Sequence, residues 1–282
     1  SIDRLAPPLE HESHGDLPVL LSIPHAGTDY PDWLLGKSTG GRVALEPLED
    51  PIVDRLAWRA IAAGTGAVVA RTPRAAIDCN RSLDELDPLT VDFAIEPGER
   101  SPRLRAGLGL FPSRTPRHGA LWRRPMTRAE TEARIAQAYR PYHRAIAERL
   151  ERLALVCGEA LLIDLHSMPP RPRGQPQAQV VIGDRFGTSA APWLTDLAAA
   201  TVRRAGFTAA CNDPFAGGEI VARHGRPATG IHAFQVEIDR TTYCQADCRS
   251  PGPGFERVAT LVALLVERLG SAIEQRRAIA AE

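Results

Sequence analysis

Three mainly apolar runs in the chain contain, or end near, a residue that can take part in chemistry. They are residues 19–23 before His25, residues 161–165 before His166, and residues 231–238, which contain Glu237. A short apolar run bounded by turn residues is typical of a strand that is buried on both faces. Parallel strands present their carboxyl ends at one edge of a sheet, where the ligands of open α/β folds bind. We therefore expect the three side chains to lie near a functional site.

Stretches with helical spacing of apolar residues alternate with these runs. They cover residues 50–64, 127–155, 190–205 and 255–276, and their spacing predicts amphipathic helices. Thr127 and Glu130 form a capping-box pattern at the start of the second helix, and Pro141 is a potential interruption within it. Further short strands are predicted at residues 67–70, 75–77 and 180–182. This alternation predicts an α/β fold with a mixed, mainly parallel sheet flanked by helices.

Two stretches of the chain show neither the apolar runs of buried strands nor the spacing of amphipathic helices. Residues 1–17 are expected to form an irregular arm, and residues 84–124 are irregular and rich in Pro, Gly and Arg. A connection of that length is uncommon in a compact domain unless it is functional. We therefore expect a single domain over residues 1–282, with an irregular lid or insertion at about residues 84–125.

Composition narrows the classes of function. The chain has 282 residues, 44% of them hydrophobic, and Lys+Arg and Asp+Glu both total 34. A sizeable core is possible, and the lack of a basic excess argues against nucleic-acid binding. No apolar run approaches the ~20 residues of a membrane span, and residues 1–15 lack the order of a signal peptide. Five scattered cysteines favour a reduced, cytoplasmic protein. The expected partner is a small molecule, and the oligomeric state stays open.

His25 and His166 are candidate ligands of one catalytic metal ion, because they stand at equivalent strand ends. Two imidazoles, an acidic third ligand and an open position are typical of catalytic zinc sites. The acidic candidates are Asp29, Glu49, Asp50 and Asp164. Asp164 alternates with His166 along one strand and could instead orient its imidazole. Asp50 could also be a helix cap, and Glu49 a solvated charge.

A second polar segment, residues 74–81, ends with Asp78, Asn80 and Arg81. The forked guanidinium of an arginine can bind a substrate carboxylate through two parallel hydrogen bonds. Arg240, which follows the run at residues 231–238, offers the same chemistry. A turn with a surface arginine is the alternative for both segments.

Six short segments together resemble the N-formylglutamate amidohydrolase family. They are SIPHAG (22–27), ED (49–50), IDCNR (77–81), DLHSMP (164–169), NDPFAGG (212–218) and VEIDRTTY (236–243). The resemblance runs from about residue 18 to about residue 270. The family is related to the zinc carboxypeptidases and aspartoacylases. It therefore implies a phosphorylase/hydrolase-like fold of the zinc-exopeptidase type, with a sheet of the eight-stranded type and a single zinc.

The resemblance also implies roles for individual residues. The metal ligands would be His25, His166 and an acid, and the carboxypeptidases place that acid three residues after the first histidine. This chain has Thr28 there, whereas the family resemblance places an acidic pair at Glu49 and Asp50. We choose Asp50 as the third ligand of one divalent ion, with zinc as the expected metal.

The remaining implied roles concern the substrate. The residues expected to bind its carboxylates are Asn80, Arg81, Arg240 and Tyr243, and the expected catalytic residues are Glu237, as general base, and Arg81. The implied reaction is metal-dependent hydrolysis of N-formyl-L-glutamate, or a closely related N-acyl amino acid, to glutamate and formate. The alternatives are a deacylase or carboxypeptidase-like enzyme of the same scaffold for another N-acyl amino acid, and a non-catalytic sensor of amino-acid derivatives.

Overall fold

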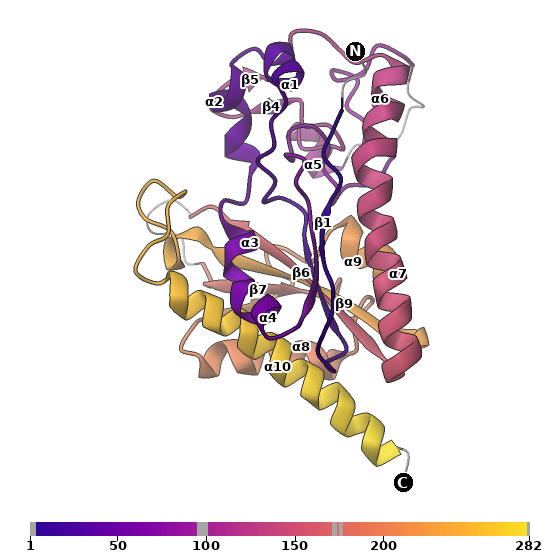
Figure 1. The fold of residues 1–282 in the computed structure, drawn as a ribbon. Helices are drawn as coiled ribbons and strands as arrows, with labels where there is room; N and C mark the ends of the chain where they lie inside the picture. The colour runs from indigo at the N-terminus through magenta and orange to yellow at the C-terminus, as the bar shows by residue number, and fades with distance from the viewer. Residues whose placement is uncertain (1–3, 95–100, 171–173, 175–176, 281–282) are drawn as a thin grey trace. The chain divides into compact units, whose positions relative to one another are not determined.

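The computed structural model describes residues 4–94, 101–170, 174 and 177–280, and many of its helices and strands are labelled in Figure 1. Contacts divide the chain into two compact units, each of which is discontinuous in sequence. The first unit comprises Ser1–Leu9, Pro24–Glu49 and Val69–Arg144, and the second comprises Glu10–Ile23, Asp50–Val68 and Ala145–Glu282. The single domain with a lid at about residues 84–125 stays a prediction.

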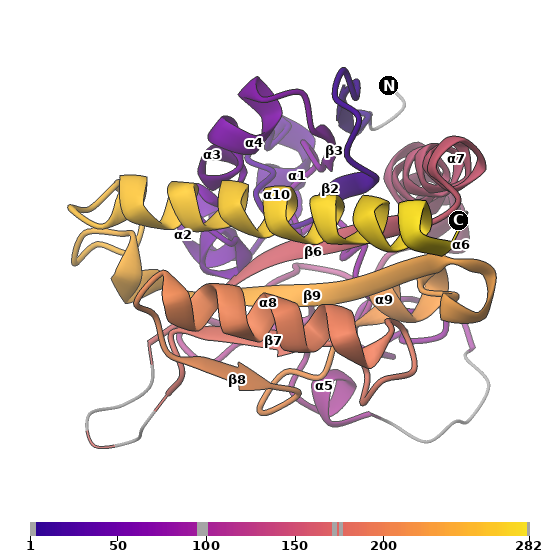
Figure 2. The same ribbon diagram turned by 90° about the horizontal axis from the view of Figure 1, so that it is seen from below.

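A seven-stranded sheet forms the centre of the second unit. Its strand order is β1-β3-β2-β6-β9-β7-β8, and Figure 2 shows β6, β9, β7 and β8 as neighbours. The strands are β1 (Leu9–His11), β2 (Val19–Ile23), β3 (Gly66–Val69), β6 (Ala160–Met168), β7 (Val180–Gly183), β8 (Ala209–Cys211) and β9 (Ile231–Asp239). The pairs β2–β6, β6–β9 and β7–β8 are parallel, and β7 runs antiparallel to β9. The mixed, mainly parallel sheet is confirmed, with seven strands in the described part of the chain rather than eight.

Helices cover this sheet because their apolar residues recur on one face. α10 (Phe255–Ala280) packs along α8 (Pro192–Arg204), as Figure 2 shows. It also packs on α3 (Val53–Leu56) and α4 (Trp58–Ala62), while α9 (Glu219–His224) contacts β6 and β9. Every residue of β2, β6 and β9 is buried. Polar residues in these three strands therefore lie in the core. Within the described ranges, no helix is both long and apolar enough to cross a membrane.

The first unit is built from short elements and the start of one long helix. These are α1 (Asp32–Lys37), α2 (Gly41–Leu45), η1 (Glu46–Leu48), α5 (Pro102–Arg105), the hairpin β4 (Arg114–Thr115) and β5 (Gly119–Ala120), and α6 (Arg128–Arg134). A π-helical turn, η2 (Ile135–Tyr139), then leads into α7 (Arg140–Cys157), which continues into the second unit. The buried Arg134 side chain stacks on Trp33, Phe111 and Trp122.

Several elements differ from the sequence prediction for identifiable reasons. The helix predicted at residues 50–64 begins only at Val53, because Pro51 disfavours a helical Asp50 and Ile52 is left-handed, with φ 53°. The strand predicted at residues 75–77 is a turn in which the amide of Ala76 donates to the carbonyl of Pro73. Alanine is a poor strand former, which fits this outcome.

The other differences concern the long helix and the two irregular stretches. The capping box of Thr127 and Glu130 is confirmed, with both reciprocal hydrogen bonds present. The helix continues past Pro141, because the wider π turn just before it accommodates a residue that lacks an N–H. The stretch at residues 1–17 contains β1, and the stretch at residues 84–124 contains α5, β4 and β5.

Candidate metal centre

Four polar side chains lie side by side toward the carboxyl ends of β6 and β9. The parallel register pairs Asp164 with Gln235 and His166 with Glu237. Residues two apart in a strand point to the same face, so all four share one face of the sheet. All four are buried. The strands therefore place the imidazole of His166 beside the carboxylate of Glu237, as expected from the two apolar runs. Asp164 and Gln235 form a second polar pair two residues earlier on each strand.

The imidazole of His166 lies between two carboxylates. Its Nε2 is 2.7 Å from Oδ2 of Asp164, and its Nδ1 is 3.2 Å from Oδ2 of Asp50. The other oxygen of Asp164 accepts a hydrogen bond from the Ser22 hydroxyl at 2.7 Å. Burial opposes the charged imidazolium, but the two carboxylates outweigh it and hold the pKa of His166 well above its usual range. The contact expected between Asp164 and His166 is thus present, and the orienting role of Asp164 stays a prediction.

Asp50 is held from its other side by an arginine. Nη2 of Arg240 donates to Oδ1 of Asp50 at 3.0 Å, and Nε of Arg240 donates to the Ser167 hydroxyl at 3.0 Å. Each oxygen of the Asp50 carboxylate therefore has its own neighbour, Arg240 on one and His166 on the other. Arg240, predicted to bind substrate, is engaged with the candidate acidic ligand.

The turn that carries Asp50 is fixed by a buried tyrosine. The Tyr243 hydroxyl donates to the carbonyl of Pro51 at 3.1 Å, and burial raises the pKa of this phenol. The next residue, Ile52, has φ 53°, which is a strained conformation for a β-branched side chain. Tyr243, predicted to bind substrate, is fully buried and supports this turn.

A second aspartate supports His25, which lies two residues after β2. Nε2 of His25 is 2.7 Å from Oδ1 of Asp78, and the backbone N–H of Asn80 donates to the same oxygen. Nε of Arg74 donates to Oδ2 of Asp78 at 2.8 Å, and Nη2 of Arg81 lies 3.6 Å from that oxygen. Burial would raise the pKa of Asp78, but Arg74, Arg81 and His25 hold it well below its usual range.

Asp78 stands in the predicted carboxylate-binding segment, but its sequence context indicated no role for it. The signal was its place directly before Asn80 and Arg81, in the same segment as the predicted carboxylate-binding pair. Arg81 itself is buried and donates to the carbonyls of Leu108 and Asn80, at 2.7 and 2.6 Å. Burial lowers the pKa of Arg81 to about 10, so it stays charged at neutral pH.

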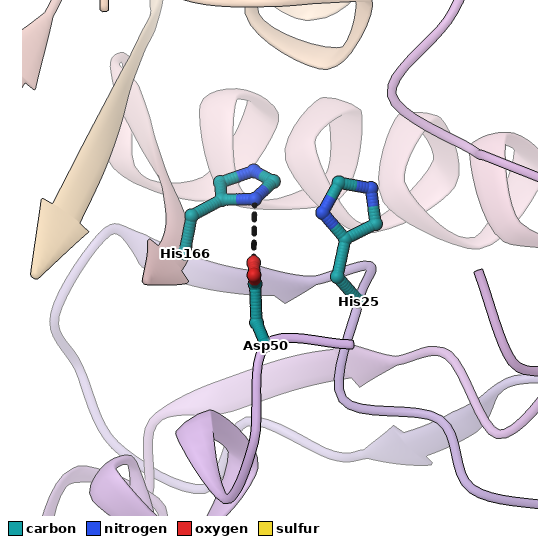
Figure 3. Close-up of side chains that lie close together, drawn as sticks. All are labelled: His25, Asp50 and His166. Atoms are coloured by element: carbon teal, nitrogen blue, oxygen red, sulfur yellow. Dashed lines mark hydrogen bonds and ion pairs between the residues drawn. The ribbon is translucent and has the colours of Figure 1, made fainter. Parts of the chain in front are cut away.

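His25, Asp50 and His166 form a group that could hold a metal ion. One ligand atom from each lies within 4.8 Å of the others, and all three residues are buried. Figure 3 shows the three side chains pointing toward one another. Atoms that share one zinc at about 2 Å lie within about 4 Å of each other, so the group is close to that spacing. The donor set, two imidazoles and one carboxylate, also fits a catalytic zinc or a similar ion.

The other acidic candidates are engaged elsewhere. Glu49 accepts a hydrogen bond from the Tyr30 hydroxyl at 2.5 Å. Asp29 pairs with Arg71 at 2.7 Å, and both side chains are exposed. Asp164 supports His166, as described above. Among the residues that the structure describes, Asp50 is the candidate acid that forms a possible metal-binding group with His25 and His166.

Glu237 is held by a neighbour that sequence reasoning missed. Its Oε1 accepts a hydrogen bond from the side-chain amide of Gln235 at 2.6 Å. The signal for Gln235 was its spacing, since it stands two residues before Glu237, as Asp164 stands two residues before His166.

The chain matches one family model and several known proteins. The matched model is described as N-formylglutamate amidohydrolase and covers residues 17–244. The N-formylglutamate deformylase of Pseudomonas aeruginosa is 31% identical over 236 residues, which are 81% of this chain and 83% of that protein. The N-formylglutamate deformylase of Pseudomonas putida is 30% identical over 82% of this chain and 83% of that protein.

Solved structures agree with these matches. The crystal structure of N-formylglutamate amidohydrolase from Ralstonia eutropha JMP134 has a TM-score of 0.88 and 32% identity, covering 96% of this chain and 99% of that one. A gene product of Agrobacterium tumefaciens has a TM-score of 0.64 at 20% identity, with 96% of each chain covered, and supports the fold alone. The chain therefore belongs to the N-formylglutamate amidohydrolase family and is a hydrolase that acts on an amide bond.

Proposed function

We propose that the protein hydrolyses N-formyl-L-glutamate to glutamate and formate, or a closely related N-acyl amino acid to the free amino acid and the carboxylate of its acyl group, with one divalent metal ion, zinc, held by His25, Asp50 and His166. One observation carries this proposal. Each histidine has one ring nitrogen 2.7 Å from a buried aspartate, and the group that both histidines form with Asp50 lies beside Glu237 in the strand register. The names of the relatives support the choice of substrate.

The aspartates that contact the two histidines would prepare them to bind the metal ion. A carboxylate on one ring nitrogen fixes the orientation of the imidazole and raises the basicity of the other nitrogen. Asp78 does this for His25, and Asp164 does it for His166. A zinc ion bound here would lower the pKa of a coordinated water to ~7 and polarise the substrate carbonyl.

Glu237 is the proposed general base. Its carboxylate takes the proton of the attacking water and delivers it to the amide nitrogen that leaves as an amine. Its place beside His166 in the register puts it within the same buried region. A buried carboxylate is costly unless it has a partner. This cost is easier to explain if Glu237 carries protons in catalysis than if it is only a solvated charge.

Asn80 and Arg81 are the proposed anchors of one substrate carboxylate. The guanidinium of Arg81 stays charged, and its hydrogen bonds to two backbone carbonyls hold it in one orientation. The proposed site also includes Arg240 and Tyr243, which would contact substrate while keeping their bonds to Asp50 and Pro51. A bidentate arginine selects a planar carboxylate over a neutral amide.

A metal and activity assay tests the proposal. The purified protein should contain about one equivalent of metal, and chelation should abolish formate release from N-formylglutamate until zinc returns. Glu237→Gln should keep metal and lose about 10²–10⁴-fold in kcat. Glu267→Gln makes the same change on the exposed face of α10 and should match the parent. Hydrolysis that survives full removal of metal would contradict the proposal.

A panel of substrates decides between the related activities. N-formylglutamate, N-formylaspartate, N-acetylglutamate and N-formylglutamine differ in one group each. A preference for N-formylglutamate supports the proposed substrate, and a preference for another N-acyl amino acid replaces it with that compound. Binding of these compounds without turnover by the metal-loaded protein would indicate a sensor.

A further inference from the structure

Gln235 joins two parts of the second unit through its side-chain amide. Its Nε2 donates to Oε1 of Glu237 at 2.6 Å, and its Oε1 accepts from the backbone N–H of Gly218 at 3.0 Å. The side chain is 3% exposed. Both ends of a buried amide are therefore engaged, one of them on the proposed base.

The direction of this amide is dictated by Gly218. A backbone N–H can only donate a hydrogen bond, so the oxygen of the Gln235 amide must face Gly218. The nitrogen must then face Glu237, where it donates to a carboxylate. The hydrogen bond from Gly218, which lies outside β9, thus sets the orientation in which the Gln235 amide donates to Glu237.

The glycine-rich segment, residues 212–218, can reach Gln235 because it packs tightly against the end of β7. A Cβ atom on Gly183 would lie 2.6 Å from the carbonyl oxygen of Phe215, which a side chain does not permit. Gly217 has φ 114°, a conformation that favours glycine. These two glycines allow the close approach that brings the N–H of Gly218 to Gln235.

The same arrangement occurs on the neighbouring strand with opposite polarity. Asp164 lies two residues before His166 on β6, and its carboxylate is the hydrogen-bond acceptor for Nε2 of His166. Gln235, paired with Asp164 in the register, is a donor and lies one pleat before Glu237. An acceptor therefore precedes the imidazole on β6, and a donor precedes the carboxylate on β9, as the chemistry of each group requires.

We propose that Gln235 is the positioning residue of Glu237, and that the glycine-rich segment sets its orientation. The inference rests on the proposed role of Glu237 as general base. A donor on Oε1 fixes the plane of the carboxylate and stabilises its charged form through a charge-assisted hydrogen bond. Because small misplacements of a catalytic group reduce rates strongly, loss of this donor should act on kcat.

Replacement of Gln235 by Met tests the role, since Met has similar length and no amide. Gln235→Met should lower kcat about 10–100-fold, with KM within about twofold and metal content unchanged. Gln275→Met makes the same change on the exposed face of α10 and should match the parent. If Gln235→Met does not fold, Gln235→Leu takes its place. A parental kcat in either folded variant would overturn the proposal.

A double-mutant cycle separates positioning from a merely structural role. If Gln235 acts through Glu237, Gln235→Met should cause little further loss of kcat in the Glu237→Gln background. An equal loss in both backgrounds would mean that Gln235 supports the fold alone, and the inference fails. If Glu237→Gln by itself keeps metal and the parental kcat, it is the proposed base that fails, which is a distinct outcome.

Discussion

Exchange of Asp78 and of Asp164 for Asn should give different results, although each aspartate supports one histidine. Asp164 contacts His166 and the neutral Ser22 hydroxyl. Asp78 contacts His25 and also balances the guanidinium groups of Arg74 and Arg81. An imidazole can release its proton when its carboxylate is lost, whereas an arginine keeps its charge. Asp78→Asn should therefore destabilise the fold more.

The structure sets the size of this difference. Removal of one partner of a buried ion pair costs about 3–5 kcal/mol. Arg74 is 15% exposed and Arg81 is 6% exposed, so we expect about 3 kcal/mol for Asp78→Asn, the lower end of that range. Asp164→Asn keeps a neutral acceptor for His166 and should lower the free energy of unfolding by about 1 kcal/mol. Both variants should bind metal about 10–100-fold more weakly.

Two measurements check these values. Urea unfolding of the chelated proteins gives the free energy of unfolding, and competition with a chromophoric chelator gives the metal affinity. Asp196→Asn makes the same exchange at an exposed position of α8 and should leave both quantities unchanged. Equal destabilisation by the two buried exchanges would refute the reasoning about the arginines. Unchanged metal affinity in Asp164→Asn would refute the role of the carboxylate in orienting His166.

Three further outcomes are expected. Asp50→Ala should lose the metal by elemental analysis while Glu49→Ala retains it, and the reverse result would make Glu49 the ligand. Arg81→Lys should raise KM or lower kcat/KM strongly with metal retained, because lysine lacks the planar fork; steady-state kinetics equal to the parent would remove Arg81 from the site. Burial, with Arg223 and Arg226 nearby, lowers the pKa of His224 to about 4 from its usual 6.5. The unfolded chain therefore takes up a proton that the folded chain refuses, so the free energy of unfolding should fall by up to about 3 kcal/mol between pH 6.5 and 4, at about 1.36 kcal/mol per pH unit. His224→Gln should lose this dependence in urea unfolding at several pH values, and an unchanged slope would assign it to other groups.

The sequence predicted the strands that position the site, because buried parallel strands are continuous apolar runs. The runs that became β2, β6 and β9 also identified His25, His166 and Glu237 at or just beyond their ends. The support of His166 by Asp164 followed from simple alternation along β6. These inferences needed only the local pattern of the chain and the rule that parallel strands end at one edge.

The parts that could not be predicted depend on contacts between distant segments. The role of Asp78 depends on the turn that replaced the predicted strand at residues 75–77, where the apolar pattern indicated a strand although alanine is a poor strand former. The role of Gln235 depends on Gly218, 17 residues away, and on the register between β6 and β9. The hold of Arg240 and Tyr243 on the turn with Asp50 joins segments about 190 residues apart. Local patterns contain no information on such pairs.

The pairing of β6 with β9 has a consequence for changes in chain length. Side chains alternate between the faces of a strand, so a shift of one residue in either strand would turn its functional residues to the opposite face. His166 and Asp164 would move together, or Glu237 and Gln235 together. A one-residue insertion or deletion inside these strands is therefore equivalent to losing two functional side chains at once. The length of these two strands is therefore under a stricter constraint than the length of the loops that connect them.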